Sequence, residues 1–189
     1  MKITSTPLDG VLMLEPKVLE DGRGFFMESY HREKWEASGI PQTFVQDNHS
    51  LSARAGTIRG LHYQLEPMAQ TKLVRVLAGA IYDVAVDIRR GSPRFGQWIG
   101  VILSAANKRQ LLIPPGYAHG FCTLVDDTEV MYKVDAHYAP EWDRGIRWDD
   151  PAIGIPWPAS DPIMSDKDKM LPPLESAETF SLSSLERGG

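Results

Sequence analysis

The chain has 189 residues, 42% of them apolar and 24% charged, which predicts one domain over residues 1–189 with a substantial core. The formal net charge of -5 argues against a nucleic-acid groove, although a few converging Arg and Lys side chains could still bind a phosphorylated metabolite. No secretory signal opens the sequence and no apolar run reaches the roughly 18 to 20 residues that span a bilayer, so we expect a cytoplasmic protein without a membrane partner.

Short apolar or alternating runs bounded by Gly, Pro, Asn and Ser predict a chain of β-strands. In chain order, the expected strands cover residues 11–14, 25–30, 44–49, 57–64, 72–77, 81–88, 98–103, 110–113, 120–124 and 129–136. One helix is predicted at 32–38, ended by Gly39 with Pro41 beyond it. Many short strands with almost no helix predict a β-sandwich or barrel.

Two turns and one cysteine fit this all-β interpretation. The turns at 78–80 and 114–116 contain Gly or Pro and are expected to join antiparallel neighbours. The single cysteine, Cys122, lies in an apolar run, so we expect a buried thiol and no disulfide within the chain.

Prolines become frequent from Pro151 onward and the periodicity is lost. We therefore expect residues 151–175 to wrap over the sheets in extended form. The polar stretch 176–189 is expected to fray at the end of the domain.

The segment 46–72 is unusually rich in polar side chains for a region that is otherwise strand and turn. Each donor or acceptor buried without a partner costs roughly 1 to 3 kcal/mol, so a core strand has no use for so many of them. A site for a polar, anionic substrate does. The side chains concerned are Gln46, Asp47, Asn48, His49, Arg59, His62, Gln64, Gln70 and Lys72.

Histidines on a small β-barrel raise the possibility of a metal site of the cupin type. Such sites usually have two histidines one residue apart on a strand, a carboxylate soon after, and a distant third histidine. Here Tyr63 and Gln64 follow His62, while His49 and His119 are far from it in sequence. The sequence therefore favours a site without a metal.

Six motifs in order along the chain resemble the dTDP-4-dehydrorhamnose 3,5-epimerase family, from Leu14 to about Pro173. The motifs are DGRGFF at 21–26, QDNHS at 46–50, RGLHYQ at 59–64, QTKLVRV at 70–76, DVAVDIR at 83–89 and IPPGYAHGF at 113–121. The resemblance implies a cupin-like jelly roll that uses no metal. It also implies epimerisation at C3 and C5 of dTDP-4-dehydro-6-deoxy-D-glucose, within dTDP-L-rhamnose biosynthesis.

The resemblance assigns the chemistry to four residues. A ketone at C4 acidifies the protons on C3 and C5, so inversion needs a base, an acid on the opposite face and a group that stabilises the enolate, but no redox cofactor. His62 corresponds to the base and Asp168 to the carboxylate that orients it. Tyr132 corresponds to the acid, and Lys72 to the cation beside the enolate.

Binding of the nucleotide is implied for a second set of residues. The family's diphosphate contacts correspond to Arg23, Arg59, His119 and Lys167, and its further polar contacts to Glu28, Gln46 and Asn48. Tyr138 either shapes the sugar pocket or only packs. Asp143 stands where the family often has Glu, which leaves a nucleotide contact there open.

Two structural expectations accompany these assignments. Strict strand alternation places Arg59 and His62 on opposite faces, so either a bulge at Gly60 or a detour of Arg59 around a strand end is needed. We also expect a homodimer with shared sites, in which Arg23 and Glu28 reach into the neighbouring subunit.

Two other functions stay open at this point. One is a single-carbon epimerase or ketoisomerase acting on a related dTDP-sugar, which would keep the fold and much of the pocket. The other is a non-catalytic sugar-binding jelly roll.

Overall fold

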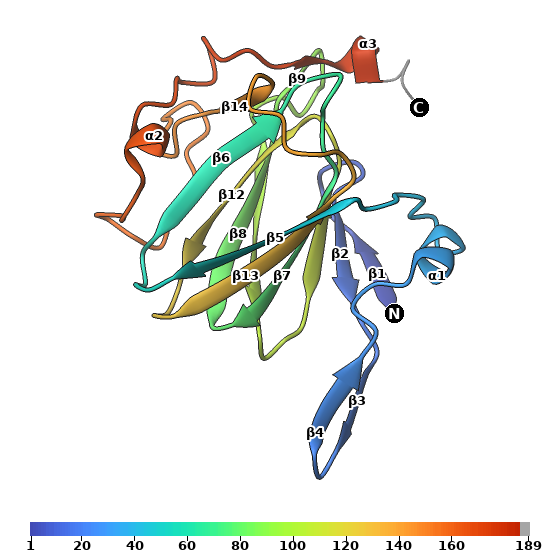
Figure 1. Cartoon of the computed structure of the whole chain (residues 1–189). Helices are drawn as coiled ribbons and strands as arrows, with labels where there is room; N and C mark the ends of the chain where they lie inside the picture. The colour runs from blue at the N-terminus through green and yellow to red at the C-terminus, as the bar shows by residue number, and fades with distance from the viewer. Residues whose placement is uncertain (186–189) are drawn as a thin grey trace.

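The computed structural model describes residues 1–185, and two antiparallel sheets contain most of the strands in this part of the chain (Figure 1). The larger sheet has the spatial order β1 (Lys2–Ser5), β2 (Leu12–Glu15), β11 (Gln110–Ile113), β7 (Lys72–Ala78), β13 (Thr128–Val134) and β5 (Gln46–Ser52). The smaller has the order β10 (Trp98–Ser104), β8 (Ala80–Asp87), β12 (Tyr117–Thr123), β6 (Ile58–Gln64) and β14 (Asp143–Gly145). The all-β prediction is therefore confirmed.

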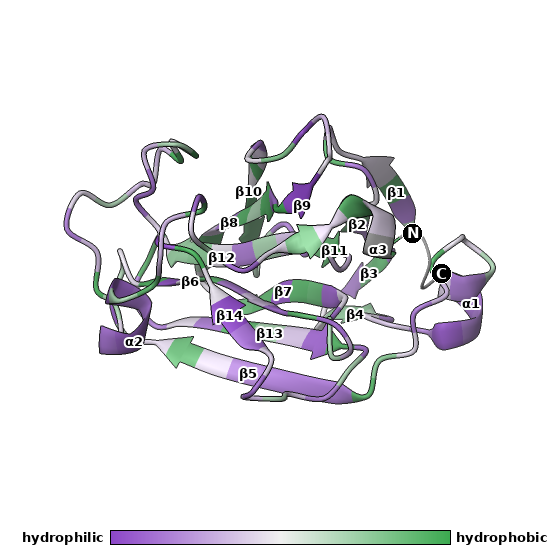
Figure 2. Cartoon of the chain, turned by 90° about the horizontal axis from the view of Figure 1, so that it is seen from above, coloured by the Kyte–Doolittle hydropathy of each residue, from purple (hydrophilic) through white to green (hydrophobic). Residues whose placement is uncertain are grey.

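Smaller elements surround the two sheets. The remaining strands are β3 (Val18–Asp21) and β4 (Gly24–Met27), which form a hairpin, and β9 (Arg89–Arg90) and β15 (Phe180–Ser181), which pair in parallel. The helices are α1 (Arg32–Glu36), α2 (Asp166–Lys169) and α3 (Leu182–Leu185). From above, the sheets are stacked layers with α2 at one end and α1 at the other (Figure 2). No helix within residues 1–185 is long and apolar enough to cross a bilayer.

Strand β8 shows how the layers are built from the sequence. Its inner positions, Ile81 and Ala85, join the cluster between the sheets, whereas Val84 and Val86 join a second cluster on the outer face. Successive side chains of a strand point to opposite faces, and both faces of β8 are covered. This double burial explains why the run 81–88 is almost continuously apolar.

Each sheet has an outer cover. The chain after β14 covers the five-stranded sheet with Ile153, Leu174 and Phe180. Trp35 of α1, together with Ile40, covers the six-stranded sheet against Leu73, Leu112 and other side chains. Burying a large apolar side chain stabilises the fold by roughly 1.5 to 3 kcal/mol, so these covers hold α1 and the C-terminal part of the described chain on the sheets.

The two predicted turns are correct as turns but wrong about the strands they join. The turn at 78–80 links β7 to β8, and the turn at 114–116 links β11 to β12; in both cases the two strands belong to different sheets. Gly79 and Gly116 have φ of +77° and +93°. Turn residues of this kind suit a corner between layers as well as a hairpin, so the local sequence does not reveal which strand becomes the hydrogen-bonded neighbour.

Most predicted strands match observed ones with small shifts at their ends. The strand expected at 44–49 is β5, and the one expected at 25–30 is the shorter β4. The sequence predicted none of the elements β1, β3, β9, β14, β15, α2 and α3. Cys122 is fully buried, as expected, and burial raises the pKa of its thiol to about 11.

The C-terminal part holds short elements within irregular chain. Residues 151–175 contain α2, and residues 176–185 contain β15 and α3. The tail expected to fray runs to residue 189, so its last part, 186–189, lies outside the described residues.

Candidate active site

A cavity of about 600 Å³ lies between the two sheets beside α2. It collects most of the predicted site residues, which come from six strands, one helix and the loop between β13 and β14. Those that line it are Gln46, Asn48, Arg59, His62, Lys72, His119, Tyr132, Tyr138, Asp143, Lys167 and Asp168. Many of these side chains are cationic or donate hydrogen bonds, so the cavity suits an anionic ligand.

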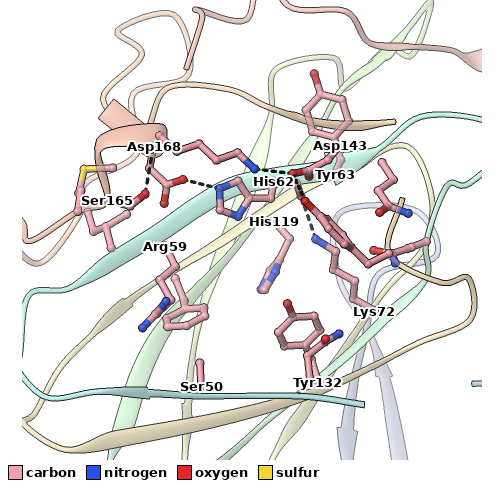
Figure 3. A pocket seen from close by; sticks show the side chains of 18 of the residues that line it. Ser50, Arg59, His62, Tyr63, Lys72, His119, Tyr132, Asp143, Ser165 and Asp168 are labelled. Carbon is pink, nitrogen blue, oxygen red and sulfur yellow. Dashed lines mark hydrogen bonds and ion pairs between the residues drawn. The ribbon is translucent and has the colours of Figure 1, made fainter. Parts of the chain in front are cut away.

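His62 of β6 is bound to a carboxylate from the far end of the chain. Its Nε2 lies 2.7 Å from Oδ1 of Asp168 in α2 (Figure 3). The backbone N–H of Gly60 donates to the other carboxylate oxygen at 3.3 Å. Burial raises the pKa of Asp168, but hydrogen bonds from His62, Gly60 and Ser165 and the charge of the imidazole outweigh it and leave the pKa lowered. Asp168 is therefore an ionised partner that fixes the imidazole ring.

The cap of α2 explains how Asp168 reaches this position. The side chain of Ser165 accepts a hydrogen bond from the backbone N–H of Asp168, which is N-capping by serine. The cap begins the helix and sets the direction of its first turn. Asp168 is buried although it lies in a short, mostly exposed helix.

A bulge at Gly60 resolves the conflict between strand alternation and a shared pocket. In the β6–β12 ladder, His62 pairs with His119 and Arg59 with Phe121, so Gly60 and Leu61 stand opposite Gly120 alone. Two residues opposite one is the definition of a β-bulge. Gly60 has φ of +132°, and Arg59 and His62 both line the cavity. The bulge hypothesis is confirmed.

Lys72 enters the cavity from the opposite sheet. Its ammonium donates a hydrogen bond of 3.0 Å to the backbone carbonyl of His62. Burial lowers the pKa of Lys72 to about 8, against the opposing effect of Asp143 and Asp83. The ammonium is a cation at neutral pH, and it is poorly solvated. Such a group interacts strongly with negative charge that develops next to it.

Tyr132 lies on β13, in the same sheet as Lys72 and opposite His62. Burial raises the pKa of its phenol, and the nearby carboxylate of Asp143 raises it further, while Arg59 opposes both. The phenol thus keeps its proton at neutral pH. It can act as a proton donor from the wall that faces the histidine.

The outer part of the cavity contains a network of polar contacts. Lys167 donates to Oδ2 of Asp143 at 2.5 Å, and the hydroxyl of Tyr138 donates to the same oxygen at 3.4 Å. On β5, Gln46 donates to Asn48 at 2.9 Å and accepts from the backbone N–H of Tyr138. Asp143 thus makes direct contacts in the cavity despite its short side chain.

Two of the predicted diphosphate contacts, Arg59 and His119, are held by hydrogen bonds at the wall of the cavity. Arg59 donates to Ser52 and to the carbonyl of Leu51, which holds its guanidinium along β5 beside the cavity. His119 is buried, and its Nε2 lies 2.7 Å from Oδ1 of Asp83. Both side chains line the cavity.

Arg23 and Glu28 lie away from this cavity. Arg23 is on the β3–β4 hairpin, which projects from the body of the subunit (Figure 1), and it is bound to Asp21 of the same hairpin. Glu28 is paired with Lys34 of α1. Neither residue is brought to His62 within one chain.

Some residues of the cavity were not assigned a role from the sequence. Ser50 follows Gln46 and Asn48 at the i, i+2 spacing of β5, so strand alternation could have identified it. Ile163 and Met164 add an apolar wall before α2, and no local pattern marks them as site residues. Among residues 1–185, no group of three or more His, Cys, Asp or Glu side chains is arranged to hold a metal ion.

Comparisons with known proteins give matches over most of the chain. A family model described as dTDP-4-dehydrorhamnose 3,5-epimerase matches residues 5–176. An enzyme of that name from Shigella flexneri is 56% identical over 89% of this chain and 93% of its own length.

Solved structures give the same match. A dTDP-4-dehydrorhamnose 3,5-epimerase from Bacillus anthracis with TDP and pyrophosphate bound is 56% identical, with a TM-score of 0.89 over 91% of this chain and 98% of that one. A dTDP-6-deoxy-D-glucose-3,5-epimerase from Legionella pneumophila, in complex with dTDP-4-keto-L-rhamnose, is 45% identical, with a TM-score of 0.91 over 95% and 97%. The cupin-like jelly-roll fold is thereby confirmed.

Proposed function

The chain belongs to the dTDP-4-dehydrorhamnose 3,5-epimerase family, and from this premise we propose that it inverts C3 and C5 of dTDP-4-dehydro-6-deoxy-D-glucose. The product is dTDP-4-dehydro-L-rhamnose, and the reaction belongs to dTDP-L-rhamnose biosynthesis. The names of the relatives support the reaction, and the bound ligands of the solved relatives support a dTDP-sugar as substrate.

One observation carries the proposal: His62 and Tyr132 enter the same cavity from opposite sheets. A sugar ring between the two walls has a base on one face and a proton donor on the other. Inversion of a carbon requires this arrangement, since the proton must leave one face and return to the other.

The proposed mechanism uses four side chains. His62 takes the proton from the carbon next to the ketone, and Asp168 holds its ring and stabilises the imidazolium that forms. Electrons from the C–H bond move to the C4 oxygen, where Lys72 stabilises the enolate. Tyr132 then donates its proton to the opposite face of the same carbon.

Substrate binding is proposed for the residues around these four. Arg59, His119 and Lys167 would bind the diphosphate, and the guanidinium suits phosphate because it can donate two parallel hydrogen bonds. Gln46, Asn48, Tyr138 and Asp143 would contact the sugar and the nucleoside. The ammonium of Lys167 has three N–H donors, so it can bind phosphate while one of them stays on Asp143.

Deuterium exchange tests the function directly. In D2O, NMR should show deuterium entering the substrate at both C3 and C5, together with formation of the L-configured sugar. Exchange at one carbon alone would identify a single-carbon epimerase. Binding of dTDP-sugar without any exchange would identify a non-catalytic binding protein and refute the proposal.

We include in the proposal that turnover needs no metal and no redox cofactor. Proton transfer next to a ketone changes no oxidation state, and the four side chains supply base, acid and enolate stabilisation. Dialysis against a chelator should therefore leave the exchange rate unchanged. Loss of turnover that only one particular divalent ion restores would contradict this expectation.

The proposal also includes a cytoplasmic location, as suits an enzyme of nucleotide-sugar metabolism, and a homodimer with shared sites. The projecting hairpin supports the dimer. Phe25 is 55% exposed and Phe26 66%, and Arg23 lies next to them. Adjacent exposed aromatic side chains on a soluble domain mark an interaction surface. A second copy of this chain would receive the hairpin at its cavity. Arg23 and Glu28 of the first copy would then reach the nucleotide bound there.

A further inference from the structure

Asp83 is a fully buried carboxylate that packing does not explain. It lies on β8 with the inward-facing Ile81 and Ala85, in the core between the sheets. Removing a carboxylate from water costs several kcal/mol unless partners compensate, and an apolar side chain of similar volume often stabilises such a position better. Retaining a charge here calls for a role beyond stability.

The hydrogen bonds of Asp83 are incomplete. Its Oδ1 lies 2.7 Å from Nε2 of His119, while Oδ2 is buried and has no hydrogen-bond partner among residues 1–185. Asp87 on the same strand, by contrast, is bonded by Arg89 and Ser92. His119 therefore compensates the negative charge of Asp83 only in part, because it binds one of the two carboxylate oxygens. It remains available to act on cationic groups in the cavity.

The partner of Asp83 stands beside the proposed base. His119 and His62 face each other across the β12–β6 ladder, where directly opposite residues have Cβ atoms about 5 Å apart. Both imidazoles line the cavity, and Figure 3 shows the bond between Nε2 of His62 and Asp168. His119 is bound through its own Nε2 to Asp83. The site therefore contains two histidine–carboxylate pairs side by side. The His62–Asp168 pair lies beside α2, and the His119–Asp83 pair lies at the buried end.

We propose that Asp83 is a positioning residue for the epimerisation, which holds the ring of His119 in place beside His62 and supplies negative charge near the ammonium of Lys72. This inference rests on the proposed function and adds a residue to its machinery. Asp83 does not line the cavity, so it acts through His119 and Lys72 and does not touch the substrate.

The charge balance of the cavity gives the physical reason. When His62 takes a proton, an imidazolium joins the cations of Arg59, Lys72 and Lys167. Asp168 balances the imidazolium and Asp143 balances Lys167, each through a hydrogen bond. Within residues 1–185, Lys72 donates only to the neutral carbonyl of His62. The carboxylates of Asp143 and Asp83 support its charge from a distance and raise its pKa against the effect of burial.

Several titratable groups share the cavity with Lys72, and a test must separate Asp83 from them. They are Arg59, His62 and Tyr63 from β6, His119 from β12, Tyr132 from β13, Tyr138 from the loop after β13, Asp143 from β14, and Lys167 and Asp168 from α2. Asp143 already has two donors in Lys167 and Tyr138, whereas Asp83 has one in His119. Asp143 acts on Lys72 more strongly than Asp83 does, so the variant must change Asp83 alone and leave Asp143 and its two donors in place.

The variant Asp83→Asn keeps the shape of the side chain and removes its charge. The rate of exchange at C3 and C5 should fall by roughly tenfold or more, while KM changes by less than about twofold, because the Asn side-chain oxygen can still accept the hydrogen bond that holds His119, a proposed diphosphate contact. The alkaline limb of the pH–rate profile should move to lower pH by about one unit, since a carboxylate that raised the pKa of Lys72 is gone. A residue with only a structural role would not move the profile.

A matched control is available on the outer surface. Glu129 of β13 accepts from His49 of β5 at 2.8 Å, a histidine–carboxylate pair of the same kind that lies outside the cavity. Glu129→Gln should leave the rate, KM and pH profile unchanged. If both variants shift the profile equally, the shift reflects the net charge of the molecule, and Asp83 has no specific role.

A second measurement needs no variant and no turnover. Nitrogen-15 NMR of the wild-type imidazoles should show a proton on Nε2 of His119, held in the hydrogen bond to Asp83. A proton on Nδ1 alone would refute the inference, even if Asp83→Asn fails to fold. Absence of exchange in the wild type would instead refute the proposed function. Wild-type exchange with an unchanged rate and profile in Asp83→Asn would refute the role of Asp83 alone.

Discussion

His62 owes its proposed role as base to the residues around its ring. A histidine in a strand is ordinarily a hydrogen-bonded structural residue, but here Asp168 binds its Nε2 and the second imidazole, of His119, stands across the ladder. The pair is partly open to the cavity, with 32% of the His62 side chain exposed and 6% of the Asp168 side chain. The ring can therefore meet a substrate, while the carboxylate that orients it stays protected from water.

The first prediction concerns the two proton carriers. His62→Ala should abolish deuterium exchange at both C3 and C5, because no other base is proposed. Tyr132→Phe should still allow some exchange but form little L-configured product, since the proton can leave but the opposite face lacks its donor. NMR in D2O distinguishes the two outcomes. Wild-type exchange rates in His62→Ala would show that the base is another group.

The second prediction concerns Lys72 and pH. Burial has lowered the pKa of its ammonium to about 8, so the cation that stabilises the enolate is present below that pH and is lost as the pH rises through it. The exchange rate should fall on the alkaline side with a midpoint near that value. In Lys72→Ala the rate should be low throughout and this alkaline limb should vanish. A limb that persists in Lys72→Ala belongs to a different group.

At the scale of the element, β6 is specialised by its bulge. The extra residue at Gly60 turns Arg59 and His62 to one side of the strand, and the N–H of Gly60 is at the same time a donor to Asp168. The peptide bond between Gly60 and Leu61 is cis. One short segment thus sets the position of the base, of a predicted phosphate contact and of the carboxylate.

The third prediction tests this bulge with Gly60→Ala. A Cβ at Gly60 would lie 2.5 Å from the Cα of Gly120 and 2.9 Å from the carbonyl oxygen of His119, both of which are backbone atoms. A positive φ at a non-glycine residue costs of order 1 to 3 kcal/mol, and the clash adds to it. We expect denaturant unfolding to show a loss of several kcal/mol, with loss of exchange.

Gly39→Ala is the matched control for the bulge. Gly39 also has a positive φ, of +85°, but a Cβ there would meet nothing within 4 Å. The control should show the cost of backbone strain alone and keep full activity. Equal losses of unfolding free energy and of exchange in the two variants would mean that the close approach of β6 and β12 contributes to neither stability nor activity.

The whole molecule presents a cavity that holds the chemistry and a hairpin that projects away from it. The hairpin exposes Leu19, Phe25 and Phe26, each more than half exposed, beside the predicted phosphate contact Arg23. A two-fold dimer would bury these side chains and complete both sites reciprocally. This combination of an incomplete site and an uncovered hairpin motivates the proposed homodimer.

The fourth prediction is complementation between Arg23→Ala and His62→Ala chains, each weak or dead as a homodimer. In a mixed dimer, the chain with intact His62 receives the intact Arg23 of the other chain. Random mixing should restore about a quarter of the sites, since roughly half of the dimers are mixed and each has one working site of two. Subunit exchange is verified by mass. No recovery after verified exchange would mean that Arg23 acts within its own chain.

The sequence alone indicated many properties of this protein. The period-two pattern and the turn residues predicted most strands, because one or both faces of most strands in the two sheets are buried and apolar side chains mark these faces. Strand alternation indicated that Arg59 and His62 share a pocket through a bulge at Gly60 or through a detour of Arg59, and glycine tolerates the backbone that a bulge requires. The six motifs pointed to the family.

Only the tertiary structure decided how the parts meet. The turns at 78–80 and 114–116 could not reveal that they cross between sheets, since pairing depends on strands distant in sequence. His62 and Asp168 are 106 residues apart, and α2, which carries Asp168, has too few residues to leave a periodic signal. The strand β14 and the contact between His119 and Asp83 were likewise hidden, because a short run or a single buried carboxylate gains its meaning only from the side chains that folding places around it.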